Sequence, residues 1–160
     1  MKDAIITVTE RIRRITDIDL EPILQRLVYA QPVTWTRERA ESAVHEYSRF
    51  LMLAVKYPGE RLVPTADTDA VWHEHIMDTL KYSRDCEFAL GRFLHHCPAE
   101  VGTSATLASE FRRTSELYER EFGESYLGSP SEASCNCTSC HNGPVLSGPA
   151  QEIRGQSAEL

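Results

Sequence analysis

The sequence predicts an all-α fold, a compact bundle of about five to six helices over residues 1–124, followed by a flexible cysteine-containing tail over residues 125–160. Three observations support this division. Apolar residues recur at steps of three and four along the first part, as they do on the buried face of a helix. Capping threonines and aspartates precede these stretches, and proline or glycine follows them. After residue 124 the sequence is rich in Ser-Pro, Gly-Pro and cysteine, a composition that cannot form a packed core.

Two helices are expected before residue 32. Residues 4–16 have helical apolar spacing, although residues 6–9 would also suit a strand. The second helix follows Asp19 as its cap and tolerates Pro22 in its first turn. The dipeptide Gln31-Pro32 ends it.

The strongest helical pattern begins at Thr34 or Thr36 and runs to about Lys56, where Tyr57-Pro58-Gly59 ends it. Its apolar side chains recur at steps of three and four and so cover one face of the expected helix.

Two further helical regions complete the predicted bundle. Thr65 or Asp67 would cap the next helix, which is expected to bend near Lys81 and to continue as helix until Cys97-Pro98. A last long helix is expected from about residue 103 to Gly123.

The bulk properties exclude several classes of function. A net charge of −7 and a pI of about 5.4 provide no basic surface for nucleic acid. The longest apolar run, residues 50–55, is far too short to cross a membrane. The N-terminal residues lack the apolar core of a signal peptide, so a cytoplasmic location is expected. In that reducing compartment the five cysteines would be free or metal-bound.

Chemistry-bearing side chains concentrate around residues 67–97. Four of the six histidines and two of the five cysteines lie between residues 73 and 97. Each residue of a helix advances about 100°, so Asp69 and His73 share a face, whereas His73 and His75 lie roughly 160° apart. Those two histidines therefore cannot chelate one ion from an undistorted helix.

This cluster predicts a metal site. Imidazole and thiolate ligands suit zinc first, with iron and copper as alternatives. The spacing matches neither a zinc ribbon nor the His-Glu-x-x-His pattern of zinc proteases. If the metal is catalytic it would activate water or oxygen, with Tyr82 or Asp85 handling protons. The predicted ligands in this region are Asp69, His73, His75, Cys86 and His96, with His95 and Cys97 beside them.

A structural interpretation of the same residues stays open. His73 could be a buried histidine bonded to Asp69, and the cysteines could be small apolar core residues. The protein would then be a non-catalytic interaction module that recruits a protein or peptide partner.

The tail carries a second group of soft ligands, Cys135, Cys137, Cys140 and His141. The run Cys137-Thr138-Ser139-Cys140-His141 has the pattern of covalent haem attachment, but that requires export and a distal ligand that the sequence does not indicate. Binding of zinc or cuprous copper fits better. A dithiol redox switch and an unstructured tail with incidental thiols are the other interpretations.

The central motif resembles the glycine-rich domain-containing protein-like family, found in plants and microbes. The resemblance covers roughly residues 15–98 and implies a helical domain without a settled activity. This chain has only 8 glycines, so roles linked to long glycine-rich segments do not follow. The matching positions that would carry a site are His73, His75, Cys86 and His96. The resemblance as a whole rests on Asp69, Trp72-His73-x-His75, Tyr82, Asp85-Cys86, Gly91 and His96-x-Pro98.

Overall fold

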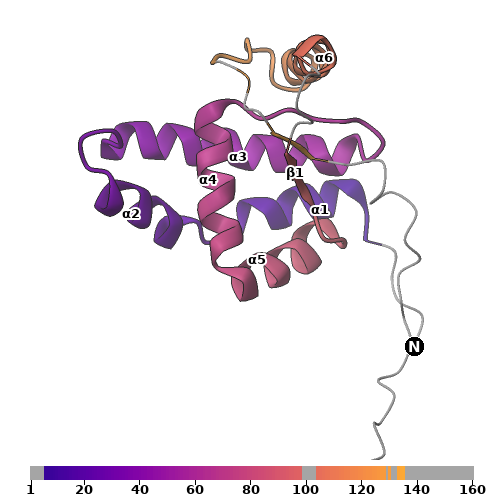
Figure 1. The fold of residues 1–160 in the computed structure, drawn as a ribbon. Coiled ribbons are helices and arrows are strands. Elements are labelled where there is room, and N and C mark those ends of the chain that lie inside the picture. Colours follow the sequence, from indigo (N-terminus) through magenta and orange to yellow (C-terminus); the bar gives the residue numbers. More distant parts are fainter. Residues whose placement is uncertain (1–5, 99–103, 129, 131–132, 136–160) are drawn as a thin grey trace, which may run out of the picture.

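The computed structural model describes residues 6–98, 104–128, 130 and 133–135, and within them the fold is helical, as predicted. Figure 1 shows how the elements are arranged. The predicted boundary at residue 124 stays a prediction, and most of the predicted tail, residues 136–160, lies outside the described part. The elements are α1 (Val8–Thr16), α2 (Glu21–Ala30), α3 (Arg37–Lys56), α4 (Ala66–Met77), α5 (Thr79–Asp85), a π-helical turn η1 (Cys86–Leu90), β1 (His96–Pro98), α6 (Ser104–Phe122) and β2 (Ala133–Cys135).

Threonine hydroxyls fix where three of the helices begin. Thr7, Thr36 and Thr65 each accept a hydrogen bond from the backbone N–H three residues later, all at 3.2 Å. Each hydroxyl satisfies a donor that the first helical turn would otherwise leave unpaired. Of the alternatives that the sequence left open, Thr36 and Thr65 are therefore the caps. Helix α2 begins after Leu20 rather than Asp19, although the Asp19 carboxylate still accepts from the N–H of Glu21 at 3.1 Å.

Helix α3, which the apolar spacing predicted, lies at the centre of the bundle. It contacts α1, α2 and α4, and α4 crosses it in Figure 1. Its inward face buries Tyr47, Phe50 and Leu51 against the other helices. Burial of such side chains stabilises the fold by about 1.5–3 kcal/mol each. No helix in the described ranges has the length and apolar composition that crossing a bilayer requires.

Helix α6 joins this core through Leu117 and Tyr118, which are buried in the same apolar cluster as α3. The hydroxyl of Thr114 accepts from the backbone N–H of Val63 at 3.0 Å and ties α6 to the segment that precedes α4. Packing continues past the end of α6, because Tyr126 is buried and its hydroxyl accepts from the N–H of Thr65 at 3.1 Å.

The sequence predicted a bend near Lys81 and helix from there to Cys97, and the structure differs in two places. The break between α4 and α5 falls at Asp78, whose side chain caps α5 through the N–H of Lys81 at 3.2 Å. The helix then ends at Leu90, where Gly91 adopts a left-handed conformation with φ 67°. Residues 96–98 instead form β1, paired antiparallel with β2. Because β1 is stabilised by pairing with β2, which is distant in the sequence, residues 91–98 themselves carry no apolar periodicity that would predict a strand.

Candidate metal centre

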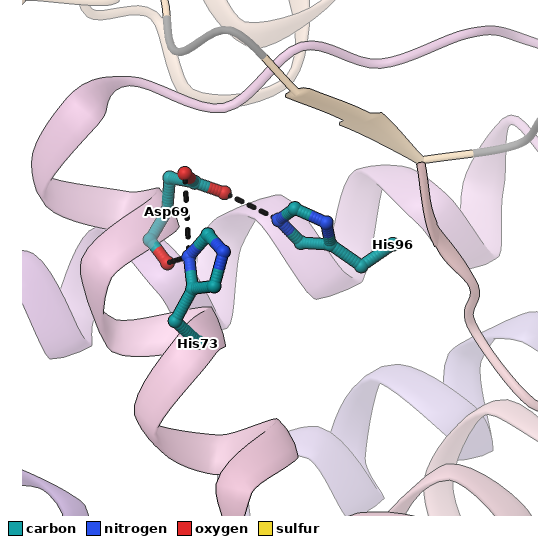
Figure 2. A group of neighbouring side chains, drawn as sticks. All are labelled: Asp69, His73 and His96. Carbon is teal, nitrogen blue, oxygen red and sulfur yellow. Dashed lines mark hydrogen bonds and ion pairs between the residues drawn. The ribbon is translucent and has the colours of Figure 1, made fainter. Parts of the chain in front are cut away.

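Three of the predicted ligands come together at the surface of α4. Figure 2 shows Asp69 and His73 on that helix and His96 reaching toward them from β1. One potential ligand atom from each of these residues lies within 4.8 Å of the other two. We call Asp69, His73 and His96 the metal cluster.

The helix itself places two members of the metal cluster. Asp69 and His73 are one turn apart, so their side chains lie on one face. The Nδ1 atom of His73 is 2.8 Å from the backbone carbonyl oxygen of Asp69 and 3.3 Å from its carboxylate. A carbonyl oxygen only accepts, so Nδ1 is the nitrogen that donates in this hydrogen bond. The His73 side chain is 57% exposed, so this side of the cluster faces solvent.

His96 completes the metal cluster from a different segment. Its Nε2 donates to the Asp69 carboxylate at 2.8 Å, and both side chains are mostly buried. Its ring lies against the indole of Trp72, with 4.5 Å between the ring centroids, and against the ring of His73 at 4.4 Å. Trp72 is itself fully buried, so the His96 ring rests on a rigid part of the core.

Asp67, the other acidic residue in the first turn of α4, takes no part in the cluster. Its two carboxylate oxygens accept from Nε and Nη2 of Arg39, on one edge of the guanidinium, at 3.0 and 2.6 Å. Such a paired geometry holds the carboxylate in place and compensates its charge. The carboxylate of the cluster is therefore that of Asp69.

The structure does not bring His75 to the metal cluster. This side chain is 1% exposed, and both of its ring nitrogens are engaged, Nδ1 with the Tyr47 hydroxyl at 3.0 Å and Nε2 with Asp85 at 2.9 Å. Burial lowers the pKa of His75, and the neighbouring Asp85 carboxylate only partly opposes this effect. His75, which the sequence analysis named as a ligand, therefore lies in the core as a polar side chain. The helical geometry had indicated only that it could not share an ion with His73.

Cys86, Tyr82 and Asp85 also lie outside the cluster. Cys86 is 2% exposed in the π-helical turn, and burial raises the pKa of its thiol. The Tyr82 hydroxyl accepts from the indole N–H of Trp72 at 2.9 Å and donates to the carbonyl oxygen of Leu94. Asp85 binds Lys81 at 2.7 Å in addition to His75.

The predicted tail ligands are mostly beyond what the structure describes. Cys137, Cys140 and His141 lie outside the described residues. Cys135 is the last residue of β2, where its backbone is the register partner of His96.

The cluster contains no residue that the sequence analysis missed. The step of four residues from Asp69 to His73 marks a shared helix face, and the metal-ligand chemistry of His96 marks it as a candidate. What the sequence did not indicate was that His96, rather than His75 or Cys86, joins that face.

The donor set suits a divalent transition metal. Bonds of about 2.0–2.1 Å around a tetrahedral zinc place its donor atoms roughly 3.4 Å apart. Because the ligand atoms of the cluster lie within 4.8 Å of one another, side-chain rotations could bring them to that spacing. Three protein ligands with one exposed side are the pattern of metal sites that keep a position for water or substrate.

Comparison with known sequences agrees with the resemblance carried by the central motif. Two proteins of Arabidopsis thaliana, glycine-rich domain-containing proteins 1 and 2, are each 32% identical to this chain over 93 residues, 54% of its length. The chain spans only 11% and 12% of those two relatives. No solved structure matches it. A sequence profile described as UCP032817-like matches residues 10–121, which is more than half of the chain. The protein therefore belongs to the UCP032817-like family.

Proposed function

We propose that this protein binds a divalent transition metal, zinc in the first instance, through Asp69, His73 and His96. The observation that carries the proposal is the convergence of one carboxylate and two imidazoles, from α4 and β1, with ligand atoms within 4.8 Å of one another. Aspartate and histidine are common zinc ligands, and the carboxylate offsets part of the ionic charge.

The hydrogen bonds within the cluster orient its side chains in a way that favours metal binding. In metalloproteins a ligating histidine commonly donates its second ring N–H to a carbonyl or carboxylate, which orients the ring. His73 already has that arrangement through the carbonyl oxygen of Asp69. For His96, an ion bound between the ring and the Asp69 carboxylate would replace the proton of their hydrogen bond. The imidazole would then take its other tautomer.

Three protein ligands leave at least one coordination position for water. A zinc ion in such a site makes its bound water markedly more acidic, so activation of water is the reaction class to test. Two histidines and one carboxylate are also the ligand set of many non-haem iron oxygenases, which keeps iron as the alternative metal.

Cys135 is the candidate for a fourth protein ligand. Its backbone holds the register position opposite His96 in the β1–β2 pair. Cobalt substitution would test this proposal, because a thiolate ligand gives a near-ultraviolet charge-transfer band. Loss of that band in Cys135→Ser, but not in Cys97→Ser, would support it. Cys137, Cys140 and His141 stay predictions for a separate soft-metal site.

The metal site is tested by titrating the purified, chelator-stripped protein with zinc, iron and copper, with elemental analysis of the product. We expect one zinc per chain to bind at Asp69, His73 and His96. Asp69→Asn, His73→Gln and His96→Gln should each weaken affinity by at least about tenfold. The matched control is His95→Gln, because His95 is exposed and lies outside the cluster.

Absence of any stoichiometric metal, together with a melting temperature that chelator does not change, would overturn the proposal. The interaction-module alternative, in which the histidine–tryptophan cluster is structural, would then explain these residues better.

A further inference from the structure

We infer that Tyr82 is a positioning residue for the proposed metal site, acting through the segment that carries His96. This inference rests on the proposed function. It assigns Tyr82 a role that differs from the proton-handling role suggested by sequence alone.

The Tyr82 hydroxyl joins two parts of the molecule that meet at the cluster. It accepts from the indole N–H of Trp72 on α4 at 2.9 Å, and it donates to the carbonyl oxygen of Leu94. All three residues are at most 1% exposed, so water does not compete for these hydrogen bonds. The hydroxyl uses both its proton and a lone pair in holding the structure.

The two hydrogen-bond partners of the Tyr82 hydroxyl, Trp72 and Leu94, are each close in the sequence to a residue of the metal cluster. Leu94 is two residues before His96, on an extended segment that has left the helix at Gly91. Trp72 precedes His73 on α4, and its ring lies against that of His96 with 4.5 Å between centroids. Through these two hydrogen bonds, Tyr82 holds the backbone segment that carries His96 close to the indole of Trp72. The His96 ring packs on that same indole.

Burial and contacts separate this role from acid–base chemistry. Tyr82 is 1% exposed, and its ring is enclosed by edge-on contacts with His75 and Phe93 at centroid distances of 5.0 and 5.1 Å. A bound substrate would have no access to its hydroxyl at this position. What Tyr82 can control is where His96 lies relative to Asp69.

The test compares Tyr82→Phe with Tyr47→Phe. Both remove a hydroxyl from a buried ring, but the Tyr47 hydroxyl bonds to His75 and not to the His96 segment. Zinc affinity is measured by calorimetry, and stability by urea denaturation of the metal-free chains. We expect both variants to lose stability. Only Tyr82→Phe should also bind zinc more weakly, by roughly tenfold to a hundredfold, as for other groups that orient a metal ligand.

A double-mutant cycle shows whether the effect passes through His96. In a His96→Gln background, Tyr82→Phe should change zinc affinity by less than about twofold, because the ligand that it positions is already absent. Equal losses of affinity in Tyr82→Phe and Tyr47→Phe, or an undiminished effect in the His96→Gln background, would overturn the inference. If Tyr82→Phe does not fold, Trp72→Phe, which removes the indole donor but keeps a ring, is judged by the same criteria.

The outcomes distinguish this inference from the proposal that it rests on. A wild-type chain that binds no zinc, iron or copper contradicts the metal site itself. A wild-type chain that binds zinc, together with a Tyr82→Phe variant of unchanged affinity, contradicts only the positioning role.

Discussion

His73 and His75 leave opposite sides of helix α4, so that the first has a 57% exposed side chain and the second a 1% exposed one. They differ accordingly in their partners, the backbone carbonyl and carboxylate of Asp69 for His73, and the side chains of Tyr47 and Asp85 for His75. One residue of separation on a helix is enough to give two histidines unrelated roles.

Truncation of these two histidines should have very different effects on stability. We expect His75→Ala to lower the free energy of unfolding of the metal-free protein by about 3 kcal/mol, because it leaves a cavity and removes partners from Tyr47 and Asp85. His73→Ala should change it by less than about 0.5 kcal/mol, as is usual at the surface. Urea denaturation monitored by circular dichroism would measure both. Equal destabilisation by the two variants would contradict the burial of His75.

Replacement of Gly91 by a residue with a side chain should destabilise the fold. Its φ of 67° is unfavourable for other residues, and a Cβ there would overlap the guanidinium of Arg11. We expect Gly91→Ala to destabilise the fold by about 1–2 kcal/mol, measured by thermal or urea denaturation. Gly59→Ala is the control, because a Cβ at Gly59 meets nothing within 4 Å. A neutral Gly91→Ala variant would show that this turn can rearrange.

The cysteines before and after Gly91 should differ in reactivity. Burial raises the pKa of the Cys86 thiol, so at pH 8 less of it is thiolate, and the buried sulfur is shielded from reagent. Cys97 is only partly buried. Brief treatment with iodoacetamide at pH 8, followed by tryptic mass spectrometry, should label Cys97 well before Cys86. The two residues fall in different tryptic peptides, 85–92 and 93–112. Equal labelling of the folded protein would be the contrary result, and labelling in urea provides the control for intrinsic reactivity.

The junction of α3 and α6 should contribute acid-sensitive stability through Glu121. Hydrogen bonds from Lys56 and Tyr57 hold the pKa of this carboxyl below its usual value of about 4.5. A depressed pKa in the folded state gives stability that is fully present above pH 4.5 and is lost as pH falls through the folded value. Glu121→Gln should therefore destabilise the protein at pH 7, and the difference from wild type should shrink as pH falls below about 4.5.

Urea denaturation between pH 3 and pH 7 would show this dependence. Glu119→Gln, which changes an exposed carboxylate on the same helix, should leave the pH profile unchanged. A stability difference for Glu121→Gln that stays constant down to pH 3 would rule out the depressed pKa.

The local features of this fold could be predicted from sequence because each depends on near neighbours. The apolar spacing of α3, its start after Thr36 and the shared face of Asp69 and His73 all follow from helical periodicity and capping. The same periodicity places His73 and His75 on different sides of the helix. It could not show that the helix ends at Leu90, because an extended segment after Gly91 is stabilised by a distant partner, β2.

What the sequence determined by itself is a helical chain that places an aspartate and a histidine on one face of α4. The tertiary structure determines that the third side chain of the cluster is His96. Pairing of β1 with β2 and packing of His96 on Trp72 are contacts between residues far apart in the chain, so the periodicity of any one segment carries no record of them. The same long-range packing encloses His75 and Cys86 in the core and leaves His73 at the surface beside Asp69 and His96.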